Sequence, residues 1–273
     1  MPLVNGRYTV RLGPWEWEYF IMGQGPDTLF AFHGFDNDAE DFNVLLPALE
    51  SRYRLVCVNL FFHGKSRPDI AAEKAVFDRK ELAALFGKLL AELGQERFSL
   101  LGFSLGGRIC LDLVTDFGGR IDRIFLLAAD GLRISPWYRF LTTHLIGRRW
   151  FRRATSDPSL FLKLAGIFRK AGMIGEKQYK FAWSYFNTPE KRRKVYDVWM
   201  IFRHILPDRR AVCRSILSNG LQLDLVFGRR DTVIPAAHAV RWQRMLESRC
   251  RIHLTDDGHN LLKKETGDLL AGL

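Results

Sequence analysis

The chain has 273 residues, of which 47% are hydrophobic and 26% are charged, and its net charge is +11. This balance is typical of a folded globular protein with a sizeable core and excludes a disordered chain, while the lack of any uncharged apolar run of about 18 residues argues against a membrane span. The segment Met1–Arg7 lacks the order of a signal peptide, and four scattered cysteines without a C-x-x-C pair indicate buried thiols in a reducing compartment, so we expect the cytoplasm.

Apolar strands alternate with amphipathic helices along most of the chain, and this alternation predicts a mainly parallel sheet of about eight strands flanked by helices. A hairpin begins the chain, with Gly13 and Pro14 at its turn. The strands are expected at Arg7–Leu12, Trp15–Met22, Thr28–Phe32, Tyr53–Leu60, Phe98–Leu101, Ile121–Ala129, Leu221–Phe227 and Arg249–Leu254. Helices are expected at about Asp41–Glu50, Ala75–Leu93, Leu105–Phe117 and Ala236–Glu247, and after His259.

The alternation stops between residues 132 and 214, where the pattern is helical, interrupted by prolines and rich in aromatics such as Trp137 and Trp199. We therefore predict a core domain of residues 1–131 and 215–273, with residues 132–214 inserted after the sixth strand as an all-helical cap. Between Arg133 and Arg214 there are 19 Lys/Arg and 5 Asp/Glu, whereas the rest of the chain has 22 and 25. The whole positive excess therefore lies in the cap.

The basic clusters of the cap are open to two interpretations. They are Arg148-Arg149, Arg152-Arg153 and Lys191–Lys194. Solvated helix faces explain them without any partner. Basic and aromatic side chains together also suit an anionic membrane surface or an anionic lipid substrate. No recognition motif accompanies the charge, which disfavours nucleic acid.

A G-x-S-x-G pattern links the fifth expected strand to the helix that follows it. Ser104 lies at its centre, with Gly102 and Gly106 two positions to either side. A serine on such a tight turn exposes its hydroxyl, and its neighbours must be small because the two backbones approach closely. The first N–H groups of the helix lie beside this serine, where they can stabilise a developing oxyanion. The pattern predicts a nucleophilic serine, although Gly and Ser also make ordinary turns.

A serine hydroxyl needs a base to take its proton, and the base works best when a carboxylate orients it. Asp231 follows the seventh expected strand and His259 follows the last. The carboxyl ends of parallel strands gather at one edge of a sheet, where ligands bind. We therefore expect Ser104, Asp231 and His259 to converge as nucleophile, acid and base.

With these residues the chain resembles the α/β-hydrolase superfamily over nearly its whole length. The order Ser, Asp, His along the chain is that of the family. Four local patterns agree: His33-Gly34-Phe35, Gly102–Gly106, Gly228–Pro235 and Gly258-His259. The stretch Phe61–Ser66 is similar to the family's GHGxS loop, with Phe62 where a glycine is usual.

The resemblance implies an oxyanion hole formed by the backbone N–H groups of Phe35 and Leu105. Some relatives take the acid from the preceding strand, which leaves Asp130 as an alternative to Asp231. His33 and His63 precede glycines in loops, where a stabilising role is expected rather than a catalytic one. No cluster has metal-ligand spacing and no dinucleotide loop is present, so we expect neither metal nor cofactor.

A serine at the elbow disfavours dehalogenase and epoxide-hydrolase chemistry, which in related proteins uses an aspartate at that position. We therefore expect a carboxylesterase-like serine hydrolase that cleaves an ester of an apolar acyl or aryl compound. A thioesterase, a C–C bond hydrolase or another acyl-transfer enzyme of this family remains open, as does a binding protein without catalysis. The sequence leaves the substrate undetermined, because the pocket depends on the cap.

Overall fold

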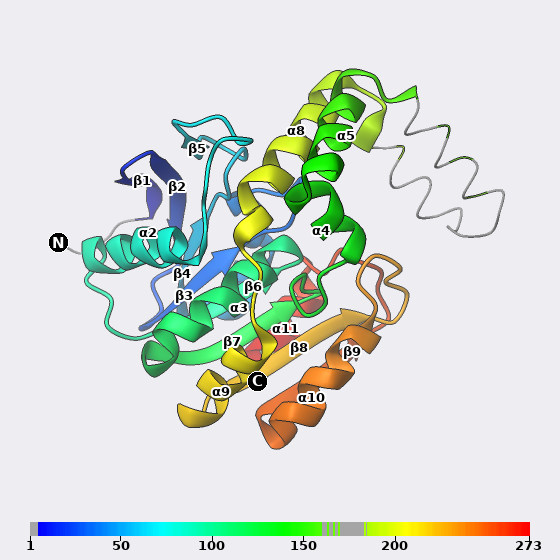
Figure 1. The fold of residues 1–273 in the computed structure, drawn as a ribbon. Coiled ribbons are helices and arrows are strands. Elements are labelled where there is room, and N and C mark those ends of the chain that lie inside the picture. The colour runs from blue at the N-terminus through cyan, green and yellow to red at the C-terminus, as the bar shows by residue number, and fades with distance from the viewer. Residues whose placement is uncertain (1–4, 160–162, 164–165, 167–168, 170–182, 184) are drawn as a thin grey trace. The chain divides into compact units, whose positions relative to one another are not determined.

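The computed structural model describes residues 5–159, 163, 166, 169, 183 and 185–273. The chain divides into two compact units, which Figure 1 shows in ribbon form. Unit 1 comprises Met1–Ile70, Phe77–Arg133 and Ile205–Leu273, and unit 2 comprises Ala71–Val76 and Ile134–His204. Each unit is described by itself.

Unit 1 is built on a sheet of nine strands in the described part of the chain, in the order β1-β2-β4-β3-β6-β7-β8-β9, with the short β5 paired to β2. The strands are β1 Gly6–Leu12, β2 Trp15–Met22, β3 Asp27–Phe32, β4 Tyr53–Val58, β5 Arg67–Pro68, β6 Phe98–Phe103, β7 Ile121–Leu127, β8 Gln222–Gly228 and β9 Cys250–Thr255. From β4 to β9 every neighbouring pair is parallel, whereas β2 is antiparallel to β1, β4 and β5. The predicted mainly parallel sheet is confirmed.

Helices lie on both faces of this sheet, with α2 and α3 in front of it and α11 behind it in Figure 1. The α-helices of unit 1 are α1 Leu46–Leu49, α2 Arg79–Glu92, α3 Leu105–Phe117, α9 Arg209–Ser218, α10 Val240–Leu246 and α11 Lys264–Ala271. Short 3₁₀ helices are η1 Ala39–Leu45, η2 Gly118–Arg120, η4 Ala236–Ala239 and η5 Glu247–Arg249. The helix α3 has the bounds expected from the sequence.

The helix α2 begins four residues later than the apolar pattern predicts. Its N-cap is Asp78, whose side chain accepts hydrogen bonds from the backbone N–H groups of Lys80 (2.9 Å) and Glu81 (3.1 Å). An N-cap side chain of this kind satisfies donors that have no partner within the helix. The preceding residues Ala71–Val76 belong to unit 2 instead.

The central strands are buried on both faces, which explains their continuous apolar sequence. Phe30, on β3, packs edge-to-face against Phe86 of α2 and Phe98 of β6, with ring centroids 5.0 Å and 5.4 Å apart. Each such side chain contributes roughly 1.5–3 kcal/mol through burial. This packing fixes α2 and the two strands as one body, and it thereby holds the carboxyl ends of β3 and β6 in place.

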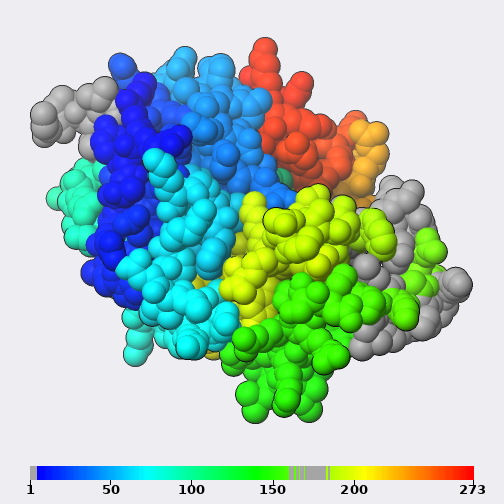
Figure 2. Space-filling view, turned by 90° about the horizontal axis from the view of Figure 1, so that it is seen from above, coloured from blue at the N-terminus to red at the C-terminus, as the bar shows by residue number. Residues whose placement is uncertain are grey.

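The described part of unit 2 consists mainly of helices, and the segment Ala71–Val76 adds a turn. Its helices are α4 Pro136–Thr143, α5 Leu145–Ser156, α8 Pro189–Ile201 and the 3₁₀ helix η3 Phe202–His204. Figure 2 shows α4 and α5 in bright green and α8 in yellow-green. The segment Ala71–Val76 joins this unit because Arg203, itself buried, donates to the carbonyl oxygens of Ala72 (3.0 Å) and Ala75 (2.6 Å).

The C-terminal border of unit 2 differs from the border of the cap that the sequence predicts. Residues 205–214, which the sequence analysis placed in the cap, are part of unit 1. Most of them belong to α9, whose Ser215 hydroxyl donates to the carbonyl oxygen of Val114 in α3 (2.7 Å). This helix therefore packs against α3 within unit 1.

All four cysteines lie in the described part of the chain, and each is a buried free thiol. Burial raises the pKa of the Cys57 and Cys110 thiols well above their usual value. Such thiols act as small apolar side chains in the core. Among the described helices, none is both long and apolar enough to cross a bilayer.

Asp112 places a carboxyl group in the interior of unit 1. We therefore predict that the free energy of unfolding depends on pH in an unusual way. It is 3% exposed in α3, and its Oδ2 has no hydrogen-bond partner among the described residues. Burial raises the pKa of Asp112 from 3.8 to about 7, against the opposing influence of Arg79. Between these values the folded state holds a proton that the unfolded state releases, so the free energy of unfolding falls as pH rises from about 4 to 7.

Replacing Asp112 by Asn removes the ionisable group and, with it, the pH-dependent loss of stability. We expect Asp112→Asn to raise the free energy of unfolding at pH 8 by up to about 4 kcal/mol, and by less at pH 5. Thermal unfolding of both proteins at the two pH values measures the effect. The matched control is Asp116→Asn on the same helix, where an exposed pair with Arg79 is lost at a cost of about 1 kcal/mol or less. An equal gain at both pH values would show that Asp112 is ionised in the folded state.

Candidate active site

Ser104 lies between the end of β6 and the start of α3, in a strained backbone conformation. Its φ of 49° and ψ of −114° fall in a region that non-glycine residues rarely adopt. Backbone hydrogen bonds hold the turn: the N–H of Ser104 donates to Leu127 (2.9 Å), and its carbonyl oxygen accepts from Gly107 (3.0 Å) and Asp130 (2.8 Å). The strain is therefore balanced by contacts to the neighbouring strand β7.

The elbow glycines lie where no side chain fits. A Cβ on Gly106 would lie 1.8 Å from the carbonyl oxygen of Phe32, and one on Gly102 would lie 2.7 Å from the backbone of Gly107. Both distances are far below any van der Waals contact. The strand–turn–helix junction at Ser104 can close this tightly only because both positions are glycine.

The structure brings Ser104, Asp231 and His259 together, although they are up to 155 residues apart in the sequence. The Nδ1 atom of His259 lies 2.8 Å from Oδ2 of Asp231, and its Nε2 lies 3.1 Å from Oγ of Ser104. An ionised carboxylate only accepts hydrogen bonds, so Nδ1 carries the proton and Nε2 accepts from the hydroxyl. The histidine is thus in the tautomer that can take a proton from Ser104.

Asp231 is positioned by the turn that follows β8. Its Oδ1 accepts hydrogen bonds from the backbone N–H groups of Val233 (2.7 Å) and Ile234 (3.0 Å), which leaves Oδ2 for His259. Burial alone would raise the pKa of Asp231, but the bonds from His259 and the two N–H groups outweigh it and the pKa is lowered. The side chain is therefore a carboxylate at neutral pH.

Asp130, the alternative acid, is engaged elsewhere. Its Oδ2 pairs with the buried guanidinium of Arg108, and its Oδ1 accepts from the N–H of Gly131 (2.7 Å). In contrast, the carboxylate bonded to the ring of His259 is that of Asp231.

The loop after β3 brings Phe35 to the neighbourhood of Ser104. A Cβ on Gly34 would lie 3.0 Å from Cβ of Ser104, so the backbone preceding Phe35 runs directly beside the serine. Leu105 is the first residue of α3, and the N–H groups of a first helical turn have no acceptor within the helix. Of the two positions that the family resemblance implies for an oxyanion hole, Leu105 thus follows Ser104 directly in the chain, and Phe35 follows the glycine whose backbone lies beside Ser104.

His33 and His63 stabilise these loops. His33 is fully buried; its Nε2 accepts from the N–H of Leu60 (3.0 Å) and its Nδ1 donates to Gly34 (2.7 Å). His63 accepts from the N–H of Asp36 at Nε2 (3.3 Å), and its ring meets that of Phe35 edge-to-face at 5.9 Å. Both rings thus help to hold the segment 33–36 in place, in keeping with the structural role expected for them.

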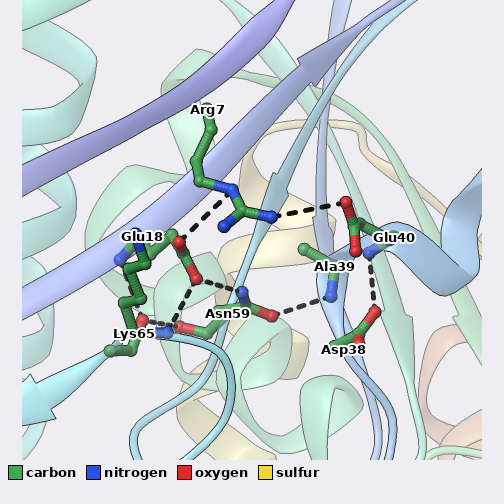
Figure 3. Close-up of polar contacts among 8 residues, drawn as sticks. Arg7, Glu18, Asp38, Ala39, Glu40, Asn59 and Lys65 are labelled. Carbon is green, nitrogen blue, oxygen red and sulfur yellow. Dashed lines mark hydrogen bonds and ion pairs between the residues drawn. The ribbon is translucent and has the colours of Figure 1, made fainter.

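Sequence reasoning missed Glu18, which anchors the two loops from strand β2 (Figure 3). Its carboxylate is 1% exposed, and Oε2 accepts from the Asn59 side chain and from the N–H of Lys65, both at 2.7 Å. Asn59 in turn accepts from the N–H of Ala39 (2.8 Å), the first residue of η1. The signal that would have found it is an acidic residue directly before the apolar run Tyr19–Met22 of β2, a strand whose other acidic residue is Glu16.

Phe62 shows why the family's loop has a glycine at this point. Its φ is 67°, a left-handed conformation that costs a non-glycine residue roughly 1–2 kcal/mol. The hydrogen bond from its N–H to the carbonyl oxygen of Ser66 (3.0 Å) holds it there. The departure from the family pattern therefore costs stability at Phe62, within a loop that this hydrogen bond closes.

We expect Glu18→Ala to loosen both loops. It would leave the buried amide of Asn59 and the partly buried N–H of Lys65 without their acceptor, at a cost of about 2–4 kcal/mol in the free energy of unfolding. Glu18→Gln retains an acceptor oxygen and should recover most of this loss. Chemical denaturation measures both variants, with Glu16→Ala, which loses a surface ion pair to Arg11, as the control. If Glu18→Ala costs no more than the control, the network does not hold the loops.

The basic clusters of unit 2 are partly structural. Arg192 donates to the carbonyl oxygens of Thr155 (2.9 Å) and Phe186 (3.0 Å), and Arg193 bonds to Asp197 (2.7 Å). Other cations of the clusters, such as Arg149, Arg153 and Lys191, are exposed. In the described residues, no three His, Cys, Asp or Glu side chains gather as metal ligands.

Comparison with known proteins agrees with this architecture. A family model described as alpha/beta hydrolase fold matches residues 27–154. The dihydrolipoyllysine-residue acetyltransferase component of the acetoin cleaving system of Cupriavidus necator is 22% identical over 81% of this chain and 56% of its own length, so the chain spans little more than half of that relative. The uncharacterized hydrolase YugF of Bacillus subtilis is 23% identical over 90% of this chain and 88% of its own. The structure of a thermophilic esterase from Thermogutta terrifontis superimposes with a TM-score of 0.66 at 17% identity, covering 98% of this chain and 96% of the esterase.

Proposed function

Because the chain belongs to the α/β-hydrolase superfamily, we propose that it is a serine hydrolase that cleaves a carboxylic ester of an apolar acyl or aryl compound. One observation carries the proposal: an unbroken hydrogen-bonded series runs from the hydroxyl of Ser104 through the ring of His259 to the carboxylate of Asp231. This series supplies a nucleophile, a base and a group that fixes the tautomer of the base.

The reaction follows from these positions. Oγ of Ser104 attacks the ester carbonyl carbon while Nε2 of His259 takes its proton, and Asp231 stabilises the resulting imidazolium. The negative oxygen of the tetrahedral intermediate is held by the N–H groups of Phe35 and Leu105. The C–O bond to the alcohol then breaks, and His259 returns its proton to the leaving oxygen. Water repeats the sequence on the acyl-enzyme and releases the acid.

The serine at the elbow favours acyl transfer. The names of two similar proteins, an esterase and an acetyltransferase component, are in keeping with such chemistry. A thioesterase or a C–C bond hydrolase would use the same three side chains. A binding protein would have no need for Ser104 in a strained turn beside a correctly oriented imidazole, which disfavours that alternative.

A panel of p-nitrophenyl esters graded by acyl length, from acetate to palmitate, tests the proposal. We expect release of p-nitrophenol with a maximum kcat/KM at one chain length, and no release above background by Ser104→Ala. The matching acyl thioesters distinguish a thioesterase, for which kcat/KM would be higher on the thioester at every length. Folded protein without activity on either series would contradict acyl transfer to small substrates.

The location and the partners form part of the same proposal. We expect the protein in the cytoplasm, acting on a small apolar molecule. We take residues 134–204, the longer segment of unit 2, as a cap whose excess of positive charge attracts an anionic lipid surface.

A further inference from the structure

The helices α4 and α5 of unit 2 meet at a compact corner. His144 is both the C-cap of α4 and the N-cap of α5, so no linker separates them. The two backbones touch there, since a Cβ on Gly147 would lie 2.0 Å from the carbonyl oxygen of Phe140. The two helices are therefore packed closely against each other where they meet, with Leu145 and Ile146 at the start of α5.

Large apolar side chains cover the outside of this corner. Leu145 is 80% exposed and Ile146 is 71% exposed, the two highest values among the exposed large apolar side chains of the described residues. In α4, Trp137 is half exposed and stacks on Phe140 with ring centroids 5.6 Å apart. The ring of Trp150 in α5 meets that of Trp137 edge-to-face at 5.7 Å. Leu145, Ile146 and Trp137 thus expose apolar surface to water on two adjoining helices, and exposed apolar surface of this kind normally marks an interaction site.

A band of arginines accompanies the apolar surface. From the start of α4 to the end of α5 the cations are Arg139, Arg148, Arg149, Arg152 and Arg153, and no acidic residue occurs until Asp157. Arg149 lies one helical turn after Leu145 and Ile146, on the same side of α5, and it is exposed. Exposed apolar residues together with tryptophans and arginines on the same pair of helices are typical of a helix that lies in a lipid interface.

We propose that this corner docks on an anionic bilayer, with Leu145 and Ile146 inserted among the lipids and Arg149 and Arg153 against the head groups. The charge favours this occupant over a second copy of the chain, because two such corners would bring their arginines together. The inference gives a location to the lipid contact proposed above. It does not depend on the chemistry at Ser104.

Vesicle co-sedimentation tests the corner directly, with phosphatidylcholine vesicles and with vesicles in which 30% is phosphatidylglycerol. We expect binding to the anionic vesicles only, reduced by 0.5 M NaCl. The double change Arg149→Gln/Arg153→Gln should weaken it about 25-fold, since each cation near such a surface contributes about fivefold. The double change Leu145→Ser/Ile146→Ser should weaken it at least about tenfold.

Matched double variants in unit 1 control for charge and for apolar area. Arg241→Gln/Arg244→Gln and Leu217→Ser/Val240→Ser change exposed residues of the same kinds and should bind like the parent protein. Ser104→Ala should also bind like the parent, so a failure of the catalytic proposal leaves this test intact. Equal binding to neutral vesicles, no binding at all, or a loss as large in the controls would overturn the inference. A change from dimer to monomer in the corner variants would instead make the corner a contact between copies.

Discussion

Ser104→Ala is expected to abolish ester hydrolysis, with a fall in kcat on the order of 10⁶. The substitution removes only the hydroxyl oxygen, which lies 3.1 Å from Nε2 of His259, and no backbone hydrogen bond of the turn depends on it. Alanine is also a better fit than a larger side chain at a φ of 49°. Activity on the best p-nitrophenyl ester measures the effect.

The variant must remain folded for this result to count. Its thermal unfolding should coincide with that of the parent within a few degrees, because no buried apolar contact is lost. A folded Ser104→Ala protein with more than a small fraction of the parent activity would mean that another group attacks the ester.

Asp231→Asn is expected to lower kcat by about 10³–10⁴, while the substrate still binds. The asparagine oxygen can keep the hydrogen bonds from Val233 and Ile234, so the turn survives. Its amide N–H₂ group then faces His259 at the point where the carboxylate accepted a hydrogen bond. This favours the tautomer with the proton on Nε2, which cannot accept the proton of Ser104.

The steady-state parameters distinguish this mechanism from a general weakening of the site. We expect kcat to fall with KM within about threefold of the parent. The matched control is Asp130→Asn, which removes half of an ion pair with Arg108 but no contact with His259. If Asp130→Asn lowers kcat as much as Asp231→Asn does, the assignment of the orienting acid is wrong.

The elbow and its helix could be predicted from the sequence because their signal is local. The pattern Gly102–Gly106 depends on a turn too tight for any other residue, and α3 follows it with an uninterrupted apolar face. The convergence of Asp231 and His259 with Ser104 could also be expected, since a parallel sheet brings its strand ends to one edge. The distances that make them a hydrogen-bonded series come only from the structure.

Features that depend on distant contacts could not be predicted. The predicted start of α2 is wrong because the carbonyl oxygens of Ala72 and Ala75 accept hydrogen bonds from the buried Arg203. This arginine lies 131 and 128 residues further along the chain, so no local pattern reveals the contact. The role of Glu18 could not be predicted for the same reason, because its partners Asn59 and Lys65 are 41 and 47 residues further along the chain. In both cases a buried charge with remote partners decides the local structure.

Covalent labelling shows whether the hydroxyl of Ser104 is an activated nucleophile. A fluorophosphonate probe, incubated with the folded protein and followed by peptide mass spectrometry, should add one phosphonyl group, on the peptide that contains Ser104. Asp231→Asn should label far more slowly, and Ser104→Ala should stay unlabelled. Folded parent protein that takes up no label, or that takes it up on another residue while Ser104 stays free, would contradict the account.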